Sequence, residues 1–548
     1  MQGFYSTVFL RSTFSVQKID SLGTVTLGVN WDDGFILRIN GEQVLSQQAP
    51  TTVSHDALAT SLHESGIPET FFFDVSDLNL VDGENTLAVF ACNITLGESS
   101  DFYFDMSIHA QVKVPEPPEL PELSDTVGLT FSHPSGFYNE NFDLLISTKI
   151  EGVDVVYTLD GSNPQNSITS VIGDSAVNIS VDPNSNTNRT TTPAVVVRTS
   201  IIKDGYKASK PTARTFIYLD KVKTQSHPGG NWPPQNLSDR SKQYMDYDMD
   251  PDVVNSGQYA GQMDAALLDI PSISVVTDNA NLFDPLIGIY VNAEGQGYEW
   301  ERECSVELIN PDHSEGFNVN AGLRIRGGWS RHNDYPKHAF RLFFREEYGN
   351  SKLIFPLFED EGVSEFDKVD LRCAQNYSWA NSGGKYNTYV REVFTRDSQK
   401  DAGQPYTRSR YYHLYLNGMY WGVFQTQERS EARFASDYFG DNKEEYDVIK
   451  RSGLNYSSDI VATDGTTDKW EEIFEFTKQG FTSNEKYYRL EGKDAEGNGI
   501  PGAEVYVDMD NLIDYMLNII FTGNYDSPVS AWGGNKGPNN MYAITNRE

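Results

Sequence analysis

The sequence has few cysteines, a deficit of basic residues and no long apolar run. Among 548 residues there are 3 Cys, and 43 Lys and Arg stand against 78 Asp and Glu, giving a formal net charge of −35. The wide spacing of Cys92, Cys304 and Cys373 indicates neither a disulfide framework nor a zinc site, and the apolar runs around Cys92 and Cys373 predict buried side chains. The acidic surface disfavours nucleic acid and anionic lipid as partners. It suits divalent cations, basic partners or solubility alone.

No apolar stretch approaches the roughly 18 residues of a membrane span, so we expect no membrane-spanning segment. The first residues, MQGFY, lack a basic segment followed by an apolar one, and no signal peptide is visible. If the protein is exported, its signal lies outside this sequence. The 30 Tyr, 30 Phe and 44 Gly instead favour β-structure with many turns, and the length predicts about three domains.

Residues 1–113 show short strand patterns separated by turn signals. Asp33-Gly34, Asn40-Gly41 and Asp82-Gly83 flank alternating apolar residues, which is typical of hairpins because such turns need positive φ. Several strands without a convincing helix predict a β-sandwich. The region resembles the jelly-roll, galactose-binding-like modules of bacterial surface proteins. Such a module binds a glycan or serves as a spacer, and both readings stay open.

A linker and a second β-unit follow. Residues 114–124 (VPEPPELPELS) predict an extended polyproline linker. Residues 125–219 contain the string YTLDGSNP at 157–164 and the turn KDGY at 203–206. These strings resemble the chitobiase/β-hexosaminidase C-terminal module, which implies an immunoglobulin-type β-sandwich that acts as an accessory. The segment contains no recognisable catalytic group, which makes a glycosidase a weak third reading of the chain.

Residues 220–265 are polar and rich in Pro and Gly, and we expect an irregular linker there. The acids Asp246, Asp248 and Asp250 are either a Ca²⁺ site or a solvated turn. Residues 266–548 predict the largest domain, a mixture of α and β. Helices are expected at 389–401 and 511–522, the second with Asp510 as its N-cap.

The first candidate site residues follow a strand. Residues 322–330 (GLRIRGGWS) place Arg326 beside Gly327 and Gly328, where backbone N–H groups and a guanidinium can meet phosphate oxygens. An ordinary hairpin is the competing reading. Lys337 then opens an alternating segment, where it either reaches nucleotide phosphates or is a solvated edge residue.

Four further candidates lie downstream. Glu392, on the expected helix 389–401, is a partner for the strand lysine or a surface charge. Glu428 follows an aromatic hairpin with the turn Asn417-Gly418. Asp526 follows a helix, and Asn540 lies further along, as in a kinase catalytic loop where Asp accepts the hydroxyl proton and Asn binds metal. The spacing between the two is longer than usual and requires an insertion.

Taken in order, segments of residues 268–548 resemble the CotH kinase family, the spore-coat CotH-like atypical kinases. The segments are IPSIS at 270–274, GIY at 288–290, WER at 300–302, RIRG at 324–327, PK at 336–337, YLNG at 415–418, WG at 421–422, YDVIK at 446–450 and GNYD at 523–526. The resemblance implies an atypical protein-kinase-like α+β fold, secretion or a cell-surface location, and phosphorylation of Ser/Thr in extracellular proteins with ATP and Mg²⁺ or Mn²⁺.

Carried over by position, the resemblance makes Asp526 and Lys337 catalytic. It places Arg326, Gly327, Gly328, Lys337, Glu392 and Glu428 at the nucleotide, with Asn540 as a metal ligand. The family also has a metal-binding Asp shortly after the Asn-Asn stretch, whereas this sequence stops at Glu548. We therefore expect a fragment whose kinase domain lacks its C-terminal part. The alternative is a non-catalytic surface or adhesion protein with glycan-binding β-modules and a degenerate kinase-like domain.

Overall fold

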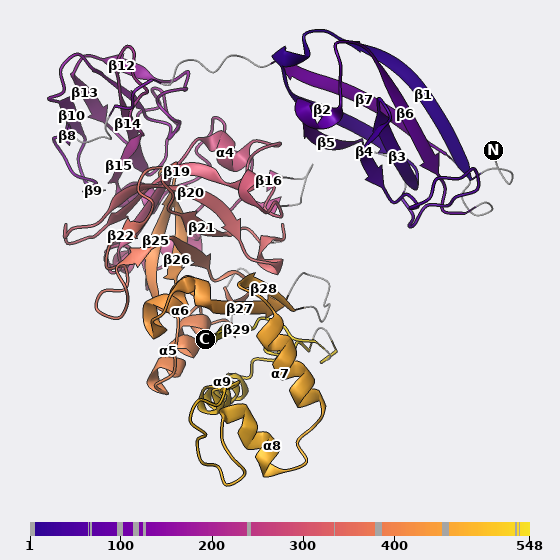
Figure 1. Ribbon diagram of the computed structural model, residues 1–548. Helices are drawn as coiled ribbons and strands as arrows, with labels where there is room; N and C mark the ends of the chain where they lie inside the picture. The colour runs from indigo at the N-terminus through magenta and orange to yellow at the C-terminus, as the bar shows by residue number, and fades with distance from the viewer. Residues whose placement is uncertain are drawn as a thin grey trace. The chain divides into compact units, whose positions relative to one another are not determined.

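The computed structural model describes residues 6–63, 65, 68–95, 102–112, 120–123, 128–237, 243–333, 335–378, 386–451, 460–531, 534–535 and 537–547. The chain divides into two compact units, Met1–Leu120 and Pro121–Glu548 (Figure 1). Most of the predicted linker at 114–124 lies outside the described residues. No helix in the described ranges is long and apolar enough to cross a bilayer.

The first unit is a sandwich of two antiparallel sheets. One sheet has the order β1-β6-β3-β4 and the other β5-β2-β7. Alternate residues of the strands point inward and form one core around Trp31, Phe35 and Leu37. The predicted β-sandwich is therefore confirmed at the level of its architecture. The strands are β1 (Thr7–Val16), β2 (Leu22–Trp31), β3 (Gly34–Ile39), β4 (Glu42–Gln47), β5 (Glu69–Asp74), β6 (Gly83–Cys92) and β7 (Phe104–Val112).

The second unit begins with another two-sheet sandwich. Its sheets have the orders β13-β10-β8 and β12-β11-β14-β15-β9 and enclose a core that includes Leu144, Val197 and Phe216. The strands are β8 (Leu129–Phe131), β9 (Gly136–Phe137), β10 (Phe142–Thr148), β11 (Asp154–Thr158), β12 (Val171–Gly173), β13 (Ala176–Val181), β14 (Ala194–Ile202) and β15 (Thr212–Ile217).

The connection at 220–265 is more ordered than expected. It holds short helices and a two-stranded ribbon, and Trp232, Met245 and Tyr247 pack into the core of the next module. The prediction of an irregular linker is wrong here. The segment is polar on average, and the three apolar side chains that pack into the core, Trp232, Met245 and Tyr247, were not recognised. The elements are α1 (Leu219–Val222), β16 (Asn236–Leu237), β17 (Gln243–Tyr244), α2 (Pro251–Val254) and α3 (Met263–Leu268).

A closed barrel with strand order β18-β19-β20-β21-β24-β26-β25 forms the middle of the second unit (Figure 1). Neighbours pair antiparallel except β18 and β25, whose parallel pairing closes the barrel. The predicted turn Asn417-Gly418 is confirmed, with φ of 47° and 82°. The elements are β18 (Ser272–Val276), α4 (Asn279–Phe283), β19 (Arg302–Ile309), β20 (Asn318–Arg326), β21 (Ala339–Phe343), β22 (Leu353–Ile354), β23 (Glu365–Phe366), β24 (Lys368–Cys373), β25 (Ser409–Leu416) and β26 (Met419–Gln427).

Helices and a small sheet, β28-β27-β29, complete the unit. The predicted cap is wrong by two residues, since Asp508 caps α9 by accepting a hydrogen bond from the Asn511 backbone N–H. The elements are α5 (Arg391–Asp401), α6 (Ala432–Phe439), β27 (Tyr446–Arg451), β28 (Ile460–Asp464), α7 (Asp468–Lys478), α8 (Asn484–Tyr488), α9 (Met509–Thr522) and β29 (Tyr542–Asn546).

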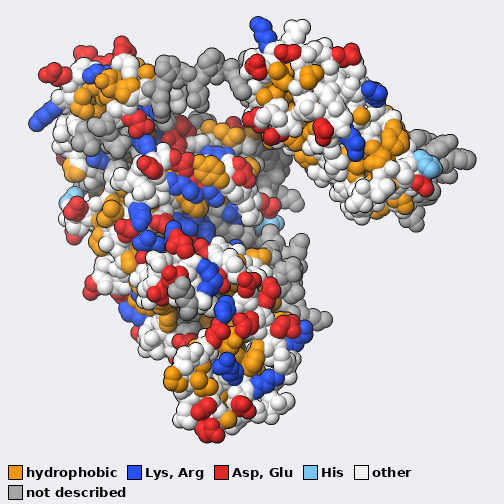
Figure 2. Space-filling model, in the orientation of Figure 1, with side chains coloured by type: hydrophobic (Ala, Val, Ile, Leu, Met, Phe, Trp, Pro, Cys, Tyr) orange, Lys and Arg blue, Asp and Glu red, His pale blue; other side chains and the backbone are white. Residues whose placement is uncertain are grey.

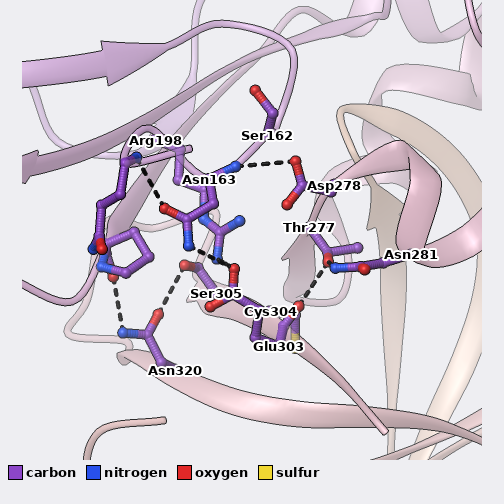
Figure 3. A network of polar contacts seen from close by, with 12 residues as sticks. Ser162, Asn163, Arg198, Thr277, Asp278, Asn281, Glu303, Cys304, Ser305 and Asn320 are labelled. Carbon is purple, nitrogen blue, oxygen red and sulfur yellow. Dashed lines mark hydrogen bonds and ion pairs between the residues drawn. The ribbon is translucent and has the colours of Figure 1, made fainter. Parts of the chain in front are cut away.

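The second sandwich and the barrel share a polar seam (Figure 3). Arg198 of β14 is fully buried and its Nη2 lies 3.4 Å from Glu303 Oε1, which also accepts a 2.8 Å hydrogen bond from Asn163 Nδ2. The Asn163 backbone N–H donates to Asp278, and Asn320 Nδ2 donates to the Pro211 carbonyl. Because these hydrogen bonds and this ion pair cross from one module to the other around the buried Arg198, the seam fixes the sandwich against the barrel.

All three cysteines are free and buried, which confirms the sequence prediction for Cys92 and Cys373. Burial raises the pKa of the Cys92 thiol to about 12 and that of Cys373 to about 11. The thiols therefore have the character of small apolar core groups.

Candidate functional site

The outer face of strands β20, β21 and β24 carries charged side chains at alternate positions. Leu323 and Ile325 point into the barrel core, so Arg324 and Arg326 point outward. On β21 the outward residue is Arg341, and on β24 the outward residues include Asp370 and Arg372. Strand pairing places Arg341 opposite both Arg324 and Asp370, which gathers these charges on one surface.

Asp370 is the centre of this surface. Its carboxylate accepts hydrogen bonds of 2.5 and 2.9 Å from Arg341 and 2.8 Å from Arg326 Nε, and the side chain is only 2% exposed. Burial alone would raise its pKa, but the guanidinium groups of Arg341 and Arg326 hold the pKa well below its usual range. Asp370 is thus a carboxylate fixed between two cations.

Glu392 and Glu431 repeat the arrangement. Glu392 of α5 pairs with Arg372, at 2.7 Å, and with Arg396. Against the effect of burial, these cations lower the pKa of Glu392. Glu431 lies 2.9 Å from Lys368 and 3.6 Å from Arg429.

Each of the three carboxylates is shared by two cations, which leaves an excess of positive charge on one face of a strongly acidic chain. We call this surface the arginine face. It consists of the three carboxylates and their six cationic partners: Asp370, Glu392, Glu431, Arg326, Arg341, Arg372, Arg396, Lys368 and Arg429. Figure 2 shows Lys and Arg side chains gathered in the middle of the molecule, where Figure 1 labels β20 and β21. Such a local excess attracts anions that the rest of the surface repels.

The predicted glycine turn lies at one end of this face. Gly327 has a φ of 120°, which favours glycine, and an added Cβ there would meet Ser330 Oγ. Arg331 stabilises the turn by donating to the carbonyls of Ile325, Gly327, Ala293 and Gly295. Its guanidinium is therefore used structurally, whereas that of Arg326 belongs to the arginine face.

Among the described residues, the contacts of the Lys337 ammonium are with the Asp246 carbonyl and Trp421, not with Asp526. Strand β21 begins at Ala339, two residues later than predicted. The Lys337 ammonium donates a 2.6 Å hydrogen bond to the Asp246 carbonyl and lies 3.9 Å from the ring centroid of Trp421. Burial lowers its pKa to about 8. These contacts give Lys337 a role in attaching the 243–250 segment to the barrel.

Replacing Lys337 with methionine is expected to lower the melting temperature, because a cation–π contact and a charged hydrogen bond are lost. Nucleotide affinity should change less than twofold. Differential scanning fluorimetry and isothermal titration with MgATP check both parts. A tenfold loss of affinity without loss of stability would instead show that Lys337 reaches the nucleotide, as the sequence predicted.

Asp526 and Asn540 are brought together, as their order in the sequence suggested. Asn540 Nδ2 donates to Asp526 Oδ2 at 2.8 Å, while Asn539 Nδ2 and Ser530 Oγ donate to Oδ1 at 2.9 and 2.5 Å. Arg451 in turn donates to Asn539 Oδ1 at 2.6 Å. The loop therefore holds one oriented carboxylate.

Strand β29 follows this catalytic-loop candidate and begins at Tyr542, two residues after Asn540. Burial lowers the pKa of Arg341, whereas Asp370, Glu431 and the Tyr542 hydroxyl raise it.

Glu428 belongs to a different cluster. It accepts hydrogen bonds from the Arg408 backbone N–H and from Tyr438, and burial raises its pKa. Its contacts are structural.

The acid cluster at 246–250 was considered as a Ca²⁺ site or a solvated turn. In it, Asp248 accepts a hydrogen bond from Gln235 and Asp250 caps α2, and calcium binding there stays a prediction.

Arg341, Asp370, Arg372 and Arg396 are not among the residues predicted from the sequence. For Arg341, Asp370 and Arg372 the available signal was charge at alternate positions in strands whose other positions are apolar. Arg396 lies on α5, where that signal does not apply.

The described residues suit phosphate and a hard cation. The Arg372 and Arg429 side chains are 20% and 21% exposed, so their guanidinium groups present part of their surface to a phosphate oxygen. No group of three or more His, Cys, Asp or Glu in that part could hold a metal alone. Mg²⁺, however, binds through one or two carboxylates together with substrate phosphates, and Asp526 with the Asn540 amide offers such oxygens.

Comparison with known proteins adds a family match. Residues 323–545 match the family model described as CotH kinase protein. This match confirms the sequence resemblance for that segment, which is less than half of the chain. The assignment of the two β-modules as galactose-binding-like and chitobiase C-terminal-like stays a prediction, and so does the kinase-like fold. No curated protein matches the chain.

Solved structures give only distant likenesses. A β-glucuronidase of Dictyoglomus thermophilum is 11% identical with a TM-score of 0.14, over 41% of this chain and 38% of that chain. The Bifidobacterium dentium β-glucuronidase in complex with coumarin-3-O-glucuronide is 13% identical with a TM-score of 0.16, over 41% and 40%. The chain thus spans about two fifths of the length of each enzyme. TM-scores this low say nothing about the fold or activity of this chain.

Proposed function

We propose that the second unit is a CotH-like phosphotransferase that binds a nucleoside triphosphate through the arginine face and phosphorylates Ser/Thr hydroxyls of extracellular proteins. The observation that supports it best is the sharing of each of three carboxylates by two cations. The same unit also contains a loop with one oriented Asp. Guanidinium groups match phosphate oxygens in planar, charge-assisted pairs. The extracellular location and the protein substrate rest on the family resemblance alone.

In the proposed reaction the acceptor hydroxyl oxygen attacks the γ-phosphorus, and the bond from that phosphorus to the β–γ bridging oxygen breaks. Asp526 takes the hydroxyl proton, and the nucleoside diphosphate leaves with the electron pair of the broken bond. Asn539, Asn540 and Ser530 orient the Asp526 carboxylate for this step. A divalent cation held by the Asn540 amide oxygen would supply charge neutralisation at the phosphates. Arg326 and Arg341, preset by Asp370, would stabilise the transferring group.

Isothermal titration of the chain with MgATP and MnATP tests the binding step. Replacing Arg326 with glutamine should weaken binding about tenfold or more, because one charged hydrogen bond to phosphate contributes roughly 1.5–3 kcal/mol. The matched control is Arg489→Gln, an exposed arginine outside the arginine face, which should leave the affinity unchanged.

Transfer from γ-labelled ATP to a Ser/Thr-rich protein should be abolished by Asp526→Ala, while nucleotide binding persists. If the wild-type chain shows neither nucleotide binding nor transfer with either metal, the proposal fails. The non-catalytic surface protein then becomes the better reading.

A further inference from the structure

A groove of about 420 Å³ lies at the seam between the second sandwich and the barrel. Its size is in the range of pockets that hold small ligands, which begin at about 300 Å³. Both modules line it, and the lining includes Phe131, His133, Arg214, Glu307, Phe317 and Asn318. We call it the seam groove. It lies outside the arginine face and is not used by the proposed phosphotransfer.

A buried carboxylate organises the polar side of the seam groove. Glu307 accepts hydrogen bonds from Ser135 Oγ at 2.6 Å, Thr215 Oγ1 at 2.8 Å and Asn318 Nδ2 at 2.9 Å. Its Oε1 also lies 3.4 Å from Arg214 Nη1. The Glu307 side chain is only 4% exposed, whereas that of Arg214 is 26% exposed. Part of the Arg214 side chain is therefore accessible from the groove.

The apolar side consists of aromatic rings. The Arg214 guanidinium carbon lies 4.6 Å from the Phe131 ring centroid, which holds the guanidinium plane beside the ring. Phe317 lines the groove from the barrel and packs on Phe355. His133 lies against Phe142 with ring centroids 4.2 Å apart.

Planar polar groups beside aromatic walls match a ligand that has several hydroxyl groups and an apolar ring face. The Arg214–Glu307 pair is neutral as a whole, so it does not favour a charged ligand. We propose that the seam groove binds one or two pyranose units of a neutral glycan, with Arg214 and His133 donating to hydroxyl oxygens and Phe131 or Phe317 packing on a sugar ring. Contacts from Asn163 to Glu303 and from Asn320 to the Pro211 carbonyl join the two modules that line the groove (Figure 3), which preorganises such a site.

Saturation-transfer-difference NMR on the full chain tests this proposal with cellobiose, xylobiose, N,N′-diacetylchitobiose and lactose, and with glucuronic acid as the charged comparison. At least one neutral disaccharide should bind, and Arg214→Met and Phe131→Ala should each weaken that binding at least tenfold. Arg489→Met, which changes an exposed arginine that does not line the seam groove, is the matched control and should have no effect. Circular dichroism melting curves check that the variants fold.

If Arg214→Met or Phe131→Ala fails to fold, Phe317→Ala tests the opposite wall of the groove. Saturation transfer to none of the neutral disaccharides at 10 mM overturns the proposal, as does binding that survives the groove substitutions. Tighter binding of glucuronic acid than of every neutral sugar overturns the assignment to a neutral glycan. None of these results depends on nucleotide binding, so a failed phosphotransfer assay leaves the proposal unaffected.

Discussion

Replacing Asp370 with asparagine is expected to lower the free energy of unfolding of the second unit by about 3–5 kcal/mol, because removing one member of a buried ion pair leaves the other uncompensated. Here two guanidinium groups, those of Arg326 and Arg341, lose the same buried counter-charge. Chemical denaturation of the full chain followed by tryptophan fluorescence measures the change. Asp360→Asn, at an exposed position, is the matched control and should stay within about 0.5 kcal/mol.

The effect of Asp370→Asn should depend on pH with a defined sign. The pKa of Asp370 is far lower in the folded chain than its ordinary value of 3.8, so its stabilisation is fully present above that value. It is lost as pH falls below 3.8 toward the folded pKa. The difference between wild type and variant should therefore be largest near neutral pH and shrink in acid. A difference that stays constant from pH 7 to pH 3 would contradict the ionised Asp370 at the centre of the arginine face.

Replacing Glu307 with alanine is expected to cost about 3 kcal/mol, because the buried Thr215 hydroxyl and the partly buried donors on Ser135 and Asn318 lose their acceptor together. Glu307→Gln keeps the shape and one carbonyl acceptor, so its cost should be clearly smaller. Thermal and chemical unfolding of both variants measure the difference. Equal and small effects would show that the seam does not depend on this carboxylate.

The pH dependence at Glu307 has the opposite sign to that at Asp370. Burial raises the pKa of Glu307, so the folded chain binds this proton more tightly than the unfolded chain does. The contribution to stability therefore falls as pH rises from the ordinary value of 4.5 through the higher folded pKa. Subtracting the Glu307→Gln curve from the wild-type curve isolates this contribution.

Much of the local structure could be predicted from residues close in sequence. The Asn417-Gly418 turn and the first β-sandwich followed from turn chemistry and alternation, and the second sandwich followed from a family resemblance. The burial of Cys92 and Cys373 followed from their apolar surroundings. The order of short strings pointed to the CotH kinase family, and residues 323–545 match its model. The pairing of Asp526 with Asn540 also followed from their order, although their catalytic roles stay predictions.

The barrel closure and the functional surfaces could not be predicted in this way. Ser272 pairs with His413 across about 140 residues, and no local pattern specifies that partner. Alternation showed that Arg324 and Arg326 share a face, but strand order decided that Arg341 and Asp370 lie opposite them. The sequence also suggested Lys337 for the nucleotide, whereas its ammonium contacts the Asp246 carbonyl and Trp421.

The amino-acid sequence alone predicted the β-rich modules, the acidic surface and the similarity of residues 323–545 to the CotH kinase family model, because these depend on composition, turn residues and the order of short motifs. Only the tertiary structure decided that six cations share three carboxylates on one face and that the second sandwich is joined to the barrel by a buried polar seam. Both are products of long-range strand pairing and packing, in which side chains far apart in the chain neutralise and hydrogen-bond one another.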